Sequence, residues 1–155
     1  MFGAMVTLKE GDKAPAFKGK DQDGNEISLK QFLGKKVILF FYPEDDTPTC
    51  TQEACNFRDN YADLKKQGYE VIGISPDSME SHKKFVNKFK LNYSLLADEN
   101  KTVINAYGVW GPKKLYGREY DGIHRMIFVI NEEGRIAKIV RKVLSKKAVQ
   151  QAIKP

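Results

Sequence analysis

The residues suited to redox chemistry in this chain are two cysteines, Cys50 and Cys55, which stand five positions apart. A cysteine reacts as its thiolate, and the N-terminus of a helix or a nearby cation lowers the pKa of the thiol. Thr47 lies three residues before Cys50, and its hydroxyl can donate a hydrogen bond to the sulfur or to a bound substrate. This arrangement indicates nucleophilic thiol chemistry at Cys50.

The segments around Cys50 predict that a buried strand precedes it and that a helix contains it. Residues 37–42 are an apolar run with the length and the β-branched and aromatic content of a buried strand. The helix expected over residues 49–66, ended by Gly68, carries its apolar side chains at spacings of three and four: Cys50, Ala54, Phe57, Tyr61 and Leu64. Cys50 is therefore expected in the first turn, where unpaired N–H groups and the helix dipole favour a thiolate.

The loop between this strand and this helix is stiff and acidic. Pro43 and Pro48 restrict its backbone, and we expect Pro43 to shape the site and pack against substrate. The three acids Glu44, Asp45 and Asp46 oppose a thiolate. We therefore expect them to point outward, and we expect a cation from elsewhere in the chain to complete the site.

The spacing of the two cysteines sets a condition on any disulfide between them. On an intact helix, Cα atoms five residues apart are roughly 8–9 Å from each other and about 140° apart around the axis. A disulfide requires Cα atoms within about 7 Å. Cys50 and Cys55 can therefore bridge only if the start of the helix unwinds.

Length and composition indicate one domain over residues 1–155 and exclude several classes of protein. The chain carries a formal net charge of +6, but its basic residues are dispersed among acids, which favours a solvated surface over a nucleic-acid site. No apolar run reaches the roughly 18–20 residues of a membrane span. Residues 1–10 lack the features of a signal peptide, which favours a cytoplasmic protein, and Met5 offers an alternative start. Two cysteines are too few for a disulfide scaffold.

The remaining segments predict an α/β fold. They are an N-terminal β-hairpin element within 5–30, strands at 71–75, 93–97, 126–130 and 136–143, helices after 76–78, at 101–107 and from Ser145 to 153, and an irregular segment at 109–122. Strands and helices alternate through the middle of the chain, which indicates parallel βαβ units. The last two strands read as an antiparallel hairpin, so we expect a central mixed sheet flanked by helices.

The residues around Cys50 resemble the active site of the peroxiredoxins. The pattern Phe-Tyr-Pro-x-x-x-Thr-Pro-x-Cys over 41–50, with a second cysteine five residues later, is similar to the bacterioferritin comigratory protein (peroxiredoxin Q) branch. Thr49 stands where many members have glycine. Segments 11–17 and 122–128 resemble two further motifs of the family, so the resemblance covers nearly the whole chain and implies a thioredoxin-like fold.

The resemblance also implies roles for the site residues. Cys50 would be the peroxidatic cysteine, Cys55 the resolving cysteine of an intramolecular disulfide, and Thr47 and Pro43 would contact substrate. Arg125, at the mouth of an apolar strand, would be the cation, since its fork can hold a thiolate and peroxide oxygens together. The resemblance further implies a hydroperoxide substrate, thioredoxin or a similar dithiol as reductant, no cofactor and no metal, and we expect a monomer.

Other readings of these residues remain open. Cys50 and Cys55 also fit a structural buried thiol and an inert half-buried thiol, and Arg125 fits a surface residue at a strand end. His82 reads as a helix-surface or packing residue, and His124 is expected to point away from Arg125. The cysteine and histidine spacings match no zinc pattern, and no glycine-rich phosphate loop is present.

Two other functions compete with the peroxidase reading. One is a disulfide oxidoreductase of the thioredoxin type, although that class uses Cys-x-x-Cys rather than the spacing found here. The other is a non-catalytic module that binds a partner, such as nucleic acid, through the basic surface. An insulin-reduction assay and a salt-dependent DNA-binding assay discriminate between these readings.

Overall fold

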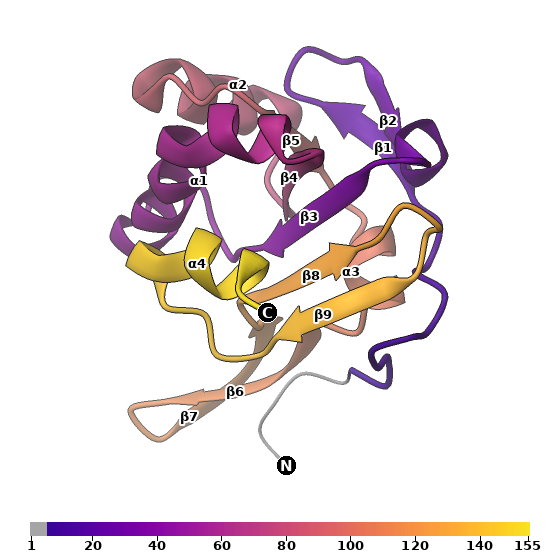
Figure 1. Ribbon diagram of the computed structural model, residues 1–155. Coiled ribbons are helices and arrows are strands. Elements are labelled where there is room, and N and C mark those ends of the chain that lie inside the picture. The colour runs from indigo at the N-terminus through magenta and orange to yellow at the C-terminus, as the bar shows by residue number, and fades with distance from the viewer. Residues whose placement is uncertain (1–5) are drawn as a thin grey trace.

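A computed structural model of the chain describes residues 6–155 and places a mixed β-sheet at its centre (Figure 1). Within these residues, seven strands form one sheet in the order β2-β1-β5-β4-β3-β8-β9. Their bounds are β1 Lys18–Asp21, β2 Glu26–Ser28, β3 Lys36–Phe41, β4 Tyr69–Ser75, β5 Ser94–Ala97, β8 Met126–Ile130 and β9 Ile136–Val140. Strands β3, β4 and β5 are parallel to one another, and the other pairings are antiparallel. The α/β fold with a mixed central sheet and an N-terminal hairpin, β1–β2, is confirmed.

Helices cover both faces of the sheet because its central strands alternate between two buried faces. In β3, Val37, Leu39 and Phe41 face one core, and Ile38 and Phe40 face the other. The helices are α1 Pro48–Lys66, α2 Met79–Phe89, α3 Thr102–Ala106 and α4 Ala148–Ile153, with short 3-10 turns at Leu29–Phe32 and Ser145–Lys147. Helices α1, α2 and α4 contribute to the core that contains Phe40, and α3 contributes to the opposite core (Figure 1).

The pairing of β3 with β8 determines which distant residue meets the start of α1. Phe41, the last residue of β3, is paired with Met126, the first residue of β8. Arg125 precedes Met126, so it lies at the carboxyl end of β3. Open α/β sheets generally bind their ligands at the carboxyl ends of their parallel strands.

The segment 109–122, expected to be irregular, forms most of a second sheet. Strands β6 (Trp110–Leu115) and β7 (Arg118–Ile123) pair as an antiparallel hairpin at the lower edge of the molecule (Figure 1). The two residues of its turn, Tyr116 and Gly117, both have positive φ (52° and 78°), as a type I′ turn requires. Tyr-Gly is not one of the common dipeptides of that turn, and the strands lack an alternating apolar pattern.

Three smaller expectations concern the last helix, the start of the chain and membrane-spanning segments. Ser145 was expected to begin the last helix, but it starts a 3-10 turn, and its hydroxyl donates to Gln52 Oε1 instead of capping α4. The alternative start at Met5 lies outside the described residues. Within residues 6–155, no helix is both long enough and apolar enough to cross a membrane.

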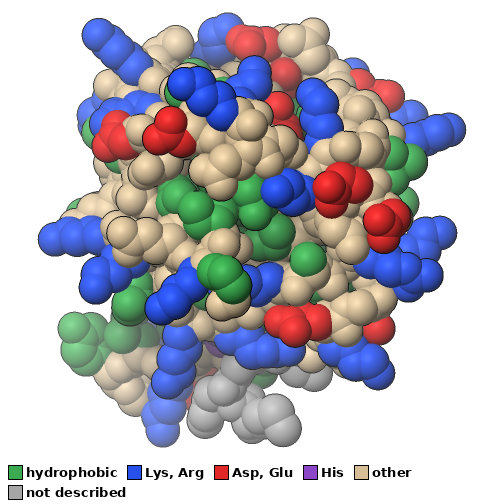
Figure 2. Space-filling model, viewed as in Figure 1, with side chains coloured by type: hydrophobic (Ala, Val, Ile, Leu, Met, Phe, Trp, Pro, Cys, Tyr) green, Lys and Arg blue, Asp and Glu red, His purple; other side chains and the backbone are tan. Residues whose placement is uncertain are grey.

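The charged side chains are mixed on the face shown in Figure 2. Lys and Arg side chains are scattered over this face, and Asp and Glu side chains lie between them. The positive net charge is therefore not gathered into a single basic patch on this side of the molecule.

Candidate active site

Cys50 lies in the first turn of α1, as expected, because that helix begins at Pro48. Proline is well suited to the first helical position, since it has no N–H to leave unpaired and its φ is already helical. Thr47 has extended backbone angles and stands at the N-cap position. Only 1 % of the Cys50 residue is exposed, so its sulfur lies in a largely desolvated place at the positive end of the helix.

Arg125 supplies the cation that Cys50 requires. Its Nη2 donates to Cys50 Sγ at 3.1 Å, and its Nη1 donates to Glu53 Oε1 at 2.6 Å. The guanidinium therefore joins the sulfur to a carboxylate on the same helix. Hydrogen bonds from a cation stabilise a thiolate more than a thiol, so this contact favours the nucleophilic form of Cys50.

Glu53 is a site residue that the sequence reasoning missed. It is completely buried, and its Oε2 has no hydrogen-bond partner within the part of the chain that the structure describes. Burial raises the pKa of the Glu53 carboxyl from 4.5 to about 7, and the nearby Arg125 only partly opposes that rise. A signal was present, because Glu53 lies three residues after Cys50 and one before Ala54, so it is an acid on the apolar face of the helix.

The two loop residues expected to contact substrate lie in the segment between β3 and α1. The hydroxyl of Thr47 donates to the carbonyl of Glu44 at 3.2 Å, so it closes a local turn. Pro43 and Thr47 are both half-buried, which leaves part of each exposed next to the start of α1. Glu44 and Asp46 are exposed, as expected.

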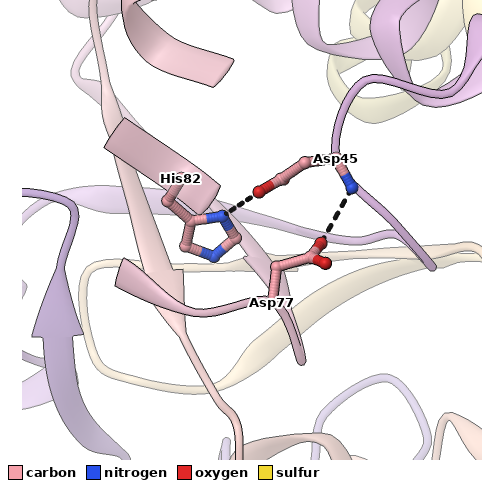
Figure 3. A group of neighbouring side chains, drawn as sticks. All are labelled: Asp45, Asp77 and His82. Carbon is pink, nitrogen blue, oxygen red and sulfur yellow. Dashed lines mark hydrogen bonds and ion pairs between the residues drawn. The ribbon is translucent and has the colours of Figure 1, made fainter. Parts of the chain in front are cut away.

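The third loop acid, Asp45, contradicts the expectation that all three acids point outward. Only 4 % of its side chain is exposed, and one carboxylate oxygen lies 2.7 Å from His82 Nδ1 (Figure 3). His82 on α2 is completely buried, so it is the expected packing residue rather than a surface one. Asp45, Asp77 and His82 are also the described side chains that lie close enough together to be considered as metal ligands.

Cys55 lies in the same continuous helix as Cys50, and both are free thiols in the structure. Cys55 is half-buried, and burial is the main reason that the pKa of its thiol is raised, with Arg58 opposing the rise. Because α1 runs unbroken through both residues, the condition derived from their spacing applies. A disulfide between them requires the start of α1 to unwind.

The β6–β7 hairpin also approaches the site. Lys113 donates to the carbonyl of Ile123 at 2.7 Å, and its pKa is lowered by burial and by the charge of Arg125, against the effect of Cys50. His124 Nε2 lies 3.1 Å from the carbonyl oxygen of Pro112, so it engages a different partner from its neighbour Arg125.

The chain is similar to known proteins in its sequence and in its fold. Residues 10–139 match the model of the AhpC/TSA family. Among curated proteins, peroxiredoxin Bcp of Escherichia coli K12 is 48% identical over 132 residues, 85% of each chain. Among solved structures, peroxidoxin BcpB of Mycobacterium tuberculosis is 31% identical with a TM-score of 0.82 and 94% coverage of each chain. The bacterioferritin comigratory protein of Xanthomonas campestris is 27% identical with a TM-score of 0.85, covering 92% of this chain and 93% of that one. Its structures are trapped intermediate and ligand complexes that bear on its alkyl peroxide reduction activity.

Proposed function

The chain belongs to the AhpC/TSA family as a thiol-dependent peroxidase of the peroxiredoxin Bcp kind, and we propose that Cys50 is its peroxidatic cysteine and Cys55 its resolving cysteine. The observation that carries this assignment is the 3.1 Å contact between Arg125 Nη2 and Cys50 Sγ in the first turn of α1. A buried thiol without a chemical role would not require a guanidinium aimed at its sulfur.

In the first step, the Cys50 thiolate attacks one oxygen of a hydroperoxide. An S–O bond forms, the O–O bond breaks, and the alcohol or water that leaves takes up a proton, so that Cys50 becomes a sulfenic acid. Arg125 holds the thiolate and stabilises the charge that develops on the leaving oxygen. Thr47 donates to the bound peroxide when its hydroxyl turns from Glu44, and Pro43 shapes the entrance.

In the second step, the Cys55 thiol condenses with the sulfenic acid. An S–S bond forms and water leaves, which requires the first turns of α1 to unwind because both cysteines lie on one helix. The unwinding breaks the contacts of Arg125 with Cys50 and Glu53. Beyond Cys55, the helix is held by Arg58, whose Nη1 donates to the carbonyl of Phe89 at 2.8 Å. The moving part therefore ends before Arg58.

A thioredoxin-type dithiol restores both thiols by exchange, and the substrates are hydrogen peroxide and organic hydroperoxides. No step requires a cofactor, a metal, nucleic acid or a membrane. We further propose that the protein acts in the cytoplasm as a monomer and as a single domain over residues 1–155. The intramolecular pairing supports the monomer, since both cysteines of the cycle lie on one chain.

The test is the consumption of hydrogen peroxide by the reduced protein, followed by intact mass and thiol count. We expect the loss of two hydrogens and both thiols, with no change in oligomeric state. Cys50→Ser should abolish consumption. Cys55→Ser should allow one stoichiometric reduction and stop thioredoxin-driven cycling, and undiminished cycling by Cys55→Ser would remove the resolving role.

A further inference from the structure

The buried carboxylate of Asp45 joins the active-site loop to the body of the protein. Its Oδ1 accepts a hydrogen bond from Tyr42 Oη at 2.6 Å. Its Oδ2 contacts His82 Nδ1 at 2.7 Å (Figure 3). The same oxygen accepts a hydrogen bond from Ser81 Oγ at 2.7 Å, and both Ser81 and His82 belong to α2. The side chain of this loop residue therefore contacts two residues of α2 that lie 36 and 37 positions further along the chain.

Both ring nitrogens of His82 have a partner within hydrogen-bond distance. Its Nε2 lies 3.1 Å from the backbone carbonyl of Leu96, which can only accept, so Nε2 carries a hydrogen. Its Nδ1 faces Asp45, whose two oxygens each accept a hydrogen bond from a hydroxyl, one from Tyr42 and one from Ser81. Burial and the nearby Asp45 raise the pKa of Tyr42, which keeps that hydroxyl a donor. The contact between Nδ1 and Asp45 Oδ2, at 2.7 Å, is therefore a short buried interaction that joins the loop to α2.

The backbone of Asp45 is held by a second contact. Its N–H donates to Asp77 Oδ2 at 2.8 Å (Figure 3). Ser75 Oγ donates to the same oxygen at 2.7 Å. Asp45 is thus fixed through its side chain and its main chain, two residues before Thr47. Asp45 also lies inside the turn that is closed by the hydrogen bond from Thr47 Oγ1 to the carbonyl of Glu44.

The geometry does not fit a metal held by the same side chains. Two ligand atoms about 2.1 Å from a tetrahedral zinc ion are roughly 3.4 Å apart. The Asp45 oxygen and His82 Nδ1 are 2.7 Å apart, which is the distance of a charge-assisted hydrogen bond.

We propose that Asp45 and His82 are positioning residues for the peroxide reaction, acting as a latch that holds the loop of residues 43–47 against α2. The latch keeps Thr47 and Pro43 at the distance from Cys50 that a bound peroxide requires. It rests on the proposed role of Cys50. The latch aligns the bound peroxide with Cys50, so its loss should slow the reaction with peroxide far more than other reactions of the sulfur. The contact between Cys50 and Arg125 does not depend on the latch.

The test measures two reactions of Cys50 in the full-length reduced protein. One is its second-order oxidation by hydrogen peroxide in a single turnover, and the other is its alkylation by iodoacetamide. Asp45→Ala should slow the peroxide reaction about 10- to 100-fold, which is the usual cost of a misplacement near 1 Å, and should change alkylation by less than about threefold. Thermal unfolding confirms that the variant is folded.

Asp45→Asn separates position from charge. An asparagine amide can donate to Ser81 Oγ and to the Nδ1 of a neutral His82, while its oxygen accepts from Tyr42, so every contact is kept. Asp45→Asn should therefore stay within about threefold of wild type. Ser81→Ala is the matched control, since it removes one hydrogen bond to Asp45 and leaves the contact between Asp45 and His82.

Several outcomes would overturn the latch. They are a folded Asp45→Ala protein with an unchanged peroxide rate, equal losses in both reactions, or an Asp45→Asn protein as slow as Asp45→Ala. If Asp45→Ala does not fold, His82→Asn replaces it, because its shorter side chain cannot span from Asp45 to Leu96. Wild type and Cys50→Ser are run alongside. A wild type that consumes no peroxide defeats the proposed function, whereas a normal wild type with an unaffected Asp45→Ala defeats only the latch.

Discussion

The buried carboxyl of Glu53 makes the stability of the reduced protein depend on pH in a calculable way. Its pKa rises from 4.5 to about 7 on folding, chiefly because burial disfavours the charged form. Between these two values the folded state holds a proton that the unfolded state has released. Stability therefore falls as pH rises through this window, and it is flat below the lower value and above the higher one. At about 1.36 kcal/mol per pH unit, the total loss is roughly 3 kcal/mol.

Glu53→Gln removes this titration while keeping the shape of the side chain and an acceptor oxygen for Arg125. The free energy of unfolding is measured with urea at pH 5 and at pH 8, with both thiols kept reduced. The difference between the two pH values should be roughly 3 kcal/mol larger in wild type than in Glu53→Gln. Titrating groups distant from Glu53 have the same surroundings in both proteins and cancel in this comparison.

The control is Glu80→Gln, because the side chain of Glu80 is 82% exposed and should leave the pH dependence of wild type unchanged. The reasoning is refuted if wild type and Glu53→Gln lose stability in parallel between pH 5 and pH 8. It is equally refuted if wild type becomes more stable over that interval relative to the variant, since that is the sign expected of a carboxyl with a lowered pKa.

Three further predictions concern contacts around the site. Arg125→Lys keeps the positive charge but loses the forked guanidinium that reaches both Cys50 and Glu53. The rate of the peroxide reaction, measured by stopped flow, should fall about 100-fold or more. A rate near that of wild type would show that the forked group is dispensable. Tyr93→Phe leaves the buried carbonyl of Ala54 without the hydroxyl that donates to it at 2.6 Å. The free energy of unfolding in urea should fall by about 1–3 kcal/mol. An unchanged value would show that another donor replaces the hydroxyl. Gly73→Ala places a Cβ 2.7 Å from side chains of the two adjacent strands, so it should destabilise by about 1–3 kcal/mol, and a neutral result would mean that the core relaxes freely.

The features that the sequence predicts well are those determined by nearby residues. The strand before Cys50, the helix that contains it and the first-turn position all follow from local apolar periodicity and from Pro48 at the helix start. Arg125 was found through a motif of the resemblance, because nothing local shows that a strand-end arginine reaches a sulfur 75 residues away. The β6–β7 hairpin was missed because half of its strand residues are exposed and its turn is Tyr116–Gly117.

The orientation of the two buried acids, Asp45 and Glu53, could not be derived locally, because each one is determined by a partner on another element. Asp45 faces His82 on α2, Asp46 contacts Lys88 on the same helix at 2.8 Å, and Glu53 contacts Arg125 before β8. Periodicity assigns a side chain to a face of its own element, but it does not show which distant cation that face meets.

These pairings explain how a reactive thiolate is compatible with so many acids close by in the sequence. The buried carboxyl of Glu53 contacts the guanidinium of Arg125 at 2.6 Å, and opposite charges at such a separation in a region of low dielectric cancel much of each other's field. The buried carboxyl of Asp45 is occupied by contacts with Tyr42, Ser81 and His82. The exposed acids act through water, which screens them. The guanidinium of Arg125 is shared, with one nitrogen on Glu53 and the other on Cys50. Glu53 therefore competes with the sulfur for the same cation, and the raised pKa of Glu53 weakens that competition whenever its carboxyl is protonated.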